Sequence, residues 1–171
     1  MSKNTQDQAA LKFQKDWNGS GYEKGESQKF WIDLLTHLYG VTDIKGFIEF
    51  EKQVKLDHTS FIDGYIPSTK VMIEQKGSHI DLNKAYTQSD GQSLTPFQQA
   101  KRYADELPYD EKPRWIVVSN FREWHIHDMN IPSGKPEVVL LENLHKEYHR
   151  LAFLVNKNNE HVTREMEVSV K

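Results

Sequence analysis

The segment at residues 60–76 (SFIDGYIPSTKVMIEQK) constrains the fold of this chain more than any other. It holds two runs rich in β-branched and aromatic residues, separated by the tetrapeptide PSTK, which is the pattern of a β-hairpin. A turn centred between Ser68 and Thr69 would set residue 66 opposite residue 71, and Asp63 opposite Glu74. The hairpin is predicted to lie in the middle of a sheet, because the positions around the two acids are apolar. These positions are Ile62, Ile66, Val71 and Ile73.

Asp63 and Glu74 predict a metal-dependent site. Directly opposed strand residues lie about 5 Å apart at Cβ, and like charges there destabilise a sheet unless a cation neutralises them. Because strand side chains alternate, Lys76 lies on the same face as Glu74, whereas Gln75 points to the other face. Asp63, Glu74 and Lys76 are therefore predicted to converge. The alternative is a solvated strand face that carries ordinary charges.

Length and composition restrict the class of protein. A chain of 171 residues is expected to form one domain, and the lack of cysteine excludes disulfides and thiolate metal sites. No stretch is long and apolar enough to cross a membrane, and the polar start MSKNTQDQ differs from a signal peptide, which favours the cytoplasm. A net charge of −3 argues against a protein that coats nucleic acid, but it is compatible with a nuclease whose carboxylates bind metal.

Hydrophobic periodicity predicts helices and strands around the hairpin, and their order indicates an α/β fold with a mixed β-sheet flanked by helices. Helices are expected at residues 6–17, 26–39, 95–107 and 143–155, and strands at 47–56, 115–119, 121–128 and 138–141. The first two helices carry clear apolar rows. These rows are Ala10, Phe13 and Trp17 in the first helix, and Phe30, Leu34 and Leu38, with Trp31 and Leu35 alongside, in the second.

Two charged residues interrupt these apolar rows. Glu26 lies four residues before Phe30 and is expected to point toward the sheet, although an acid at this place is equally well explained by the dipole at the helix N-terminus. Lys52 lies on the apolar face of the strand at 47–56. It could pair with an acidic residue or reach a phosphate, and pairing is the favoured role.

The helix after the hairpin has a strong start signal. Thr95 is expected as its N-cap, with proline at the first helical position and Gln98 completing a capping box. Gln99 and Tyr103 are four residues apart and therefore share a face of this helix. The polar segment at 77–94 connects the hairpin to it. A segment of this length is expected either to approach a substrate or to be disordered.

Two histidine pairs offer an alternative metal site. His125 and His127 share a strand face, and His145 and His149 share a helix face, so either pair could bind a transition metal. Neither pair has a third ligand close in the sequence. Zinc is therefore less favoured than a cation at the carboxylate pair.

These residues together resemble the PD-(D/E)xK nuclease superfamily. Asp63, the triplet Glu74-Gln75-Lys76 and the Q-x-x-x-Y motif at residues 99–103 match its signature, the last in the form of its RecB-like branch. More closely, residues 17–155 resemble the N-terminal endonuclease domain of MmeI-type single-chain restriction-modification enzymes. Four ordered blocks carry this resemblance: GYEKGESQKFWIDLL, FIEFEKQVKLDHTSFIDGYIPSTKVMIEQK, LTPFQQAKRYADELP and PRWIVVSNFREWHIHDM.

The resemblance implies a restriction-endonuclease-like core and a Mg²⁺-dependent DNA endonuclease, in which Mn²⁺ is expected to substitute for Mg²⁺. Asp63 and Glu74, with the backbone carbonyl of Gln75, would hold the ion. Lys76 would orient the attacking water or neutralise the transition state, whereas a role as base would require a depressed pKa.

The same resemblance suggests supporting residues. Glu26, or failing it Glu23, would complete the metal shell. Gln99 and Tyr103 would support the site or touch the DNA backbone.

The resemblance also implies that residues 1–171 form a single nuclease domain at the N-terminus of a longer protein. In such enzymes a helical connector, a methyltransferase domain that uses S-adenosylmethionine and a target-recognition domain follow. This chain has neither a glycine-rich cofactor loop nor an N-P-P-[YF] tetrapeptide, and it stops within an alternating run at residues 166–170. We therefore expect a fragment that cuts weakly, nonspecifically or not at all by itself.

The expected partners follow from this interpretation. They are double-stranded DNA, the rest of the parent polypeptide and a second copy of the domain for double-strand cleavage. The main alternative is a catalytically silent nuclease-like module for DNA binding or assembly. Metal affinity would distinguish these two. A structural domain with an acidic surface patch is a third hypothesis, and it predicts neither metal binding nor DNA binding.

Overall fold

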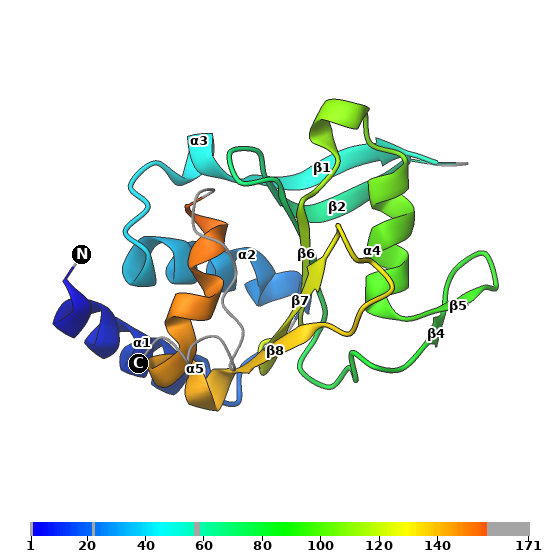
Figure 1. The fold of residues 1–171 in the computed structure, drawn as a ribbon. Coiled ribbons are helices and arrows are strands. Elements are labelled where there is room, and N and C mark those ends of the chain that lie inside the picture. The colour runs from blue at the N-terminus through cyan, green and yellow to red at the C-terminus, as the bar shows by residue number, and fades with distance from the viewer. Residues whose placement is uncertain (1, 22, 57–58, 157–171) are drawn as a thin grey trace.

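A computed structural model of the chain describes residues 2–21, 23–56 and 59–156. Its centre is a six-stranded sheet in the order β1-β2-β3-β6-β7-β8, which lies between two layers of helices (Figure 1). All neighbouring strands are antiparallel except β3 and β6, which are parallel. The predicted α/β class with a mixed sheet is confirmed, and it fits a restriction-endonuclease-like core. The strands are β1 Glu49–Lys55, β2 Thr59–Ile66, β3 Val71–Gln75, β6 Trp115–Ser119, β7 Glu123–Asp128 and β8 Glu137–Leu140.

The hairpin β2–β3 has the predicted register. Gly64 pairs with Ile73 and Ile66 pairs with Val71, so each pair has the residue-number sum expected from a turn between Ser68 and Thr69. The five residues of β3 are all buried, as predicted for a central strand. Continued by one step, this register places Asp63 opposite Glu74.

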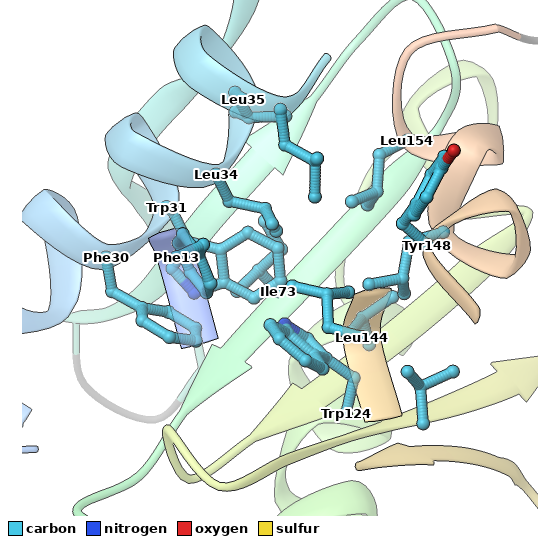
Figure 2. Close-up of a cluster of buried hydrophobic side chains, with 14 of the residues drawn as sticks. Phe13, Phe30, Trp31, Leu34, Leu35, Ile73, Trp124, Leu144, Tyr148 and Leu154 are labelled. Carbon is cyan, nitrogen blue, oxygen red and sulfur yellow. The ribbon is translucent and has the colours of Figure 1, made fainter. Parts of the chain in front are cut away.

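One face of the sheet is covered by the N-terminal and C-terminal helices (Figures 1 and 2). Ile73 of β3 and Trp124 of β7 point into this layer, and the predicted apolar rows of the first two helices are buried there. Phe30 stacks on Trp124 with 5.6 Å between ring centroids. The elements are α1 Lys3–Trp17, α2 Glu23–Asp33, η1 Leu34–Leu38, α5 Leu144–Glu147 and η4 Tyr148–Leu154.

Two of these helices differ from the prediction. The second begins three residues before Glu26, and its last part, η1, is a π-helix rather than an α-helix. The predicted closing helix at 143–155 is present, but it divides into the α-helix α5 and the 3₁₀-helix η4. Glu147, the last residue of α5, and Arg150 of η4 form a buried ion pair at 3.0 Å across the junction of these two helices.

The helix α4 Pro96–Asp105 covers the other face of the sheet. Its capping box forms as predicted, with the Thr95 hydroxyl accepting from the Gln98 amide and the Gln98 side chain accepting from the Thr95 amide. Its buried residues are Pro96, Ala100 and Ala104, and the two alanines pack against the sheet in a second core that includes Ile116 of β6.

The segment at 77–94 is ordered, so the alternative of disorder is wrong. It contains a small antiparallel pair of strands, β4 Tyr86–Thr87 and β5 Ser93–Leu94. Leu82 anchors it in the core below α4, and Asp90 accepts a hydrogen bond from Arg102 of that helix at 2.8 Å.

The first strand begins later than predicted. Phe47, which was expected to open it, is the last residue of the short helix α3 Ile44–Phe47, whose N-cap Asp43 accepts from the Gly46 amide. The remaining elements are the 3₁₀-helices η2 Tyr109–Glu111 and η3 Leu141–Asn143. Within the described ranges, none of the helices has the length and apolar character that a membrane span needs.

Candidate active site

The strands β2 and β3 separate at Asp63. Their ladder ends at the pair Gly64–Ile73, and beyond it the Gln75 amide donates to the carboxylate Oδ2 of Asp63 at 2.7 Å rather than to the β2 backbone. On the other side of β3, the Lys76 amide donates to the carbonyl of Ser119 in β6 at 2.7 Å. The end of β3 is therefore held by a side chain on one side and by the parallel strand on the other.

The carboxylates of Asp63 and Glu74 meet at this point, as the sequence predicts. The Glu74 side chain hydrogen-bonds to that of Asp63, and Glu74 is only 4 % exposed. Burial raises the pKa of Asp63 above its usual value, and the negative charge of Glu51 acts in the same direction. The Gln75 amide, the contact with Glu74 and the charge of Lys76 oppose this rise. Two carboxylates keep such a contact only when a proton or a cation lies between them.

Lys76 connects the carboxylate pair to α4. Its ammonium Nζ lies 3.6 Å from Oε1 of Glu74 and donates to Oε1 of Gln99 at 2.9 Å. The amide nitrogen of Gln99 in turn donates to the hydroxyl of Tyr103 at 3.1 Å. The structure therefore brings together Asp63, Glu74, Lys76, Gln99 and Tyr103.

The donor set fits a hard divalent cation. Two carboxylates and the backbone carbonyl of Gln75 are oxygen ligands of the kind that Mg²⁺ takes together with water and substrate phosphate. The contact between Asp63 and Glu74, which needs a positive charge or a proton, agrees with such an ion.

Among the side chains that the structure describes, no third carboxylate joins the pair in a metal-binding group. Over the ranges that the structure describes, no group of three or more His, Cys, Asp or Glu side chains is placed to hold a metal. The carboxylate of Glu26 accepts from the Gly21 amide at 3.3 Å, and the carbonyl of Gly21 accepts from the amide of Ser78, two residues after Lys76. The side chain of Glu23 lies outside the described part of the structure. Glu26 or Glu23 as a ligand stays a prediction.

Lys52 pairs with acidic residues, which was the favoured prediction. Its ammonium lies 2.6 Å from a carboxylate oxygen of Glu111 and 3.6 Å from one of Glu49, above the ring of Tyr65. The hydrogen bond to Glu111 is the main cause of the raised pKa of Lys52. These contacts explain the position of the Lys52 ammonium, so a bound phosphate is not needed to explain it.

Histidines of both pairs contact aromatic, carboxylate or amide side chains of other residues. The ring of His127 stacks on Phe97 of α4, with centroids 3.7 Å apart and the planes within 4°. His125 lies 3.5 Å from the carboxylate of Glu123, and the ring of His145 hydrogen-bonds to the Gln14 side chain at 2.8 Å. Nothing in the described part of the chain adds a third ligand to either pair.

Three residues that contact or act on the site were not predicted from the sequence to do so. The indole of Trp31 donates to the Gln75 side chain at 2.7 Å, Ser119 receives the Lys76 amide, and Glu51 acts on Asp63 by its charge. The sequence placed Trp31 beside the apolar row of its helix and Gln75 on the strand face opposite Glu74, but it did not pair these two residues.

A hollow of about 850 Å³ adjoins the site without containing the carboxylates. It is lined by the end of α1, by Ser78 and His79 just after β3, by Arg122 and Glu123, and by residues at the end of β8. It therefore opens beside the end of β3, on the side where the chain leaves Lys76.

Comparison with known proteins agrees with the resemblance seen in the sequence. No curated protein and no solved structure matches the chain. The family model described as "MmeI, N-terminal domain" matches residues 8–171, which is all but the first seven residues. This chain belongs to the family of MmeI N-terminal domains.

Proposed function

We propose that this domain is the DNA-cleaving module of a restriction-modification enzyme, a metal-dependent endonuclease that hydrolyses phosphodiester bonds. Membership of the MmeI N-terminal domain family supports the restriction-enzyme context. The observation that carries the chemical part is the meeting of Asp63 and Glu74 beside Lys76 at the end of a buried strand. A protein without chemistry at this place has no evident reason to bury two acids in contact.

Asp63, Glu74 and the carbonyl of Gln75 would hold Mg²⁺, or Mn²⁺ in its place. When bound, the ion would supply positive charge to the scissile phosphate and acidify the attacking water. The amide of Gln75 orients the Asp63 carboxylate, because it donates to Oδ2 at 2.7 Å.

Lys76 is the group of this chain that would act on the reacting atoms. Its ammonium would orient the attacking water or donate to a phosphate oxygen, since it is aimed by Gln99 at 2.9 Å and lies 3.6 Å from Glu74. Gln99 is itself oriented by Tyr103. These two half-buried residues of α4 therefore hold the lysine, and they would also touch the DNA backbone.

The other functions of the restriction-modification enzyme would come from outside this domain. The parent polypeptide would supply target recognition and methyl transfer from S-adenosylmethionine. A second copy of the domain would allow cleavage of both strands.

The test is nicking of supercoiled plasmid in Mg²⁺ or Mn²⁺, combined with Mn²⁺ binding by calorimetry. The variants are Glu74→Ala, Lys76→Ala and Asp63→Asn, the last because asparagine keeps an oxygen acceptor for the Gln75 amide while removing the charge. Lys101→Ala is the matched control, because this lysine of α4 pairs only with the exposed Asp105 in the contacts seen for it. Nicking that depends on metal, is lost in the three site variants and persists in the control would establish the nuclease.

Two other results would change the conclusion. The wild type could bind Mn²⁺ without nicking the plasmid, and Glu74→Ala could remove this binding. That result would support a metal site whose activity requires other domains of the parent polypeptide. Neither binding nor cleavage would refute the nuclease and leave a silent DNA-binding or assembly module.

A further inference from the structure

We infer that Trp31 is a positioning residue for the metal site, acting through Gln75 from the opposite face of the sheet. This inference rests on the proposed function and adds to it a residue outside the carboxylate pair. It concerns a tryptophan in the helix layer into which Ile73 points (Figure 2), whereas Glu74 lies on the opposite face of β3 because strand side chains alternate.

The side chain of Gln75 is fixed at both of its polar atoms. Its oxygen accepts from the indole nitrogen of Trp31 at 2.7 Å, and its nitrogen donates to the backbone carbonyl of Lys76 at 3.1 Å. Gln75 is fully buried and Trp31 is 1 % exposed, so water does not compete for these bonds. A buried amide with both ends bonded has one orientation.

The backbone of Gln75 takes part in the site on the other face of the sheet. The Gln75 amide donates to Asp63 at 2.7 Å, and the carbonyl of Gln75 is the third proposed metal ligand. Fixing the Gln75 side chain therefore fixes the peptide groups that orient Asp63 and face the ion. This matters here because the ladder between β2 and β3 has already ended at Gly64–Ile73, so backbone pairing with β2 no longer holds this residue.

Trp31 is itself held rigidly. It lies in α2, and its indole packs edge-on against Phe30 with centroids 5.9 Å apart at 89°. The two α2 residues belong to the same buried core as Ile73 of β3. The helix thus provides a fixed anchor for the strand end, as groups behind metal ligands commonly do.

The structure supplies a matched control for this role. Trp124 lies in the same core and is fully buried, but its indole nitrogen has no hydrogen-bond partner among the residues that the structure describes. Trp31→Phe and Trp124→Phe remove the same atoms from the same core. Only the first removes a hydrogen bond to the strand end.

The experiment measures Mn²⁺ affinity by calorimetry and plasmid nicking in both variants, in the full chain. We expect Trp31→Phe to weaken Mn²⁺ binding by about 10- to 100-fold and to lower kcat with an unchanged KM for DNA. Trp124→Phe should change Mn²⁺ affinity by less than about twofold. Amide hydrogen exchange at Gln75 and Lys76 should accelerate in Trp31→Phe and not in Trp124→Phe.

A second background tests whether Trp31 acts through Gln75. Gln75→Met keeps the length of the side chain and removes its amide, so adding Trp31→Phe to it should change Mn²⁺ affinity by less than about twofold. A further large loss in this background, or equal effects of the two tryptophan variants, would overturn the inference while leaving the proposed function intact. A wild type that binds no Mn²⁺ would overturn both.

Discussion

The buried ring of His127 should make the protein sensitive to mild acid. It is 7 % exposed and stacks on Phe97, and its Nδ1 has no hydrogen-bond partner within the described ranges. Burial, with a smaller effect from His125, lowers the pKa of His127 from 6.5 to about 4. The folded protein therefore holds this ring neutral at pH values where the unfolded chain protonates it.

The sign and size of the effect follow from linkage. Between pH 6.5 and 4 the unfolded state binds more protons, so stability rises with pH in this window and is lost as the pH falls through it. A depression from 6.5 to about 4, at 1.36 kcal/mol per unit, corresponds to about 3 kcal/mol lost by pH 4. At pH 7.5 the contribution vanishes, because the ring is neutral in both states.

The assay is urea unfolding at several pH values between 7.5 and 4. His127→Phe keeps an aromatic ring against Phe97 but cannot be protonated, so the difference in unfolding free energy between the variant and the wild type should grow by about 3 kcal/mol across the range. The exposed His79, replaced by glutamine, is the control, and its curve should run parallel to that of the wild type. Parallel curves for His127→Phe and the wild type would refute the reasoning.

Three further changes test particular contacts. Thr95→Ala removes the hydroxyl of the capping box and should lower the unfolding free energy by about 1 kcal/mol in urea titrations, whereas Thr95→Ser should retain most of it. Lys52→Met should leave DNA affinity in filter binding within about twofold, because Glu111 holds the ammonium at 2.6 Å; a large loss would show a phosphate contact instead. Arg150→Met removes the cation beside buried Glu147 and should cost about 3 kcal/mol, a loss that a thermal shift of only a degree or two would contradict.

The sequence predicts the hairpin well because its determinants are local. Two strands joined by a turn have one register once the turn is placed, and the apolar alternation on either side of Asp63 and Glu74 selects it. The capping box at Thr95 is equally local, and it fixes where α4 begins, whereas the place of Gln99 and Tyr103 beside the site was implied by the family resemblance. The carboxylate pair, the lysine and the two α4 residues were therefore accessible before any coordinates.

Other features depend on contacts across the fold. The apolar spacing of residues 143–155 suits an α-helix, but Arg150 also reaches Glu137 of β8 at 3.1 Å, and this partner is not visible in a local pattern. The same holds for the contact of Trp31 with Gln75, which joins residues 44 positions apart. Periodicity gives the face of an element, and the partner on that face follows only from the packing.

The position of the carboxylate pair follows from the mixed topology of the sheet. β3 has an antiparallel neighbour, β2, and a parallel one, β6, and only the parallel pairing continues through Gln75 to Ser119. The amide of Gln75 points toward β2, where the ladder has ended, so a buried donor would be left unsatisfied there. The Asp63 carboxylate accepts from it at 2.7 Å. An acid at this place therefore completes the backbone hydrogen bonding of the strand as well as facing Glu74, so the fold itself favours a carboxylate at the point where the proposed chemistry needs one.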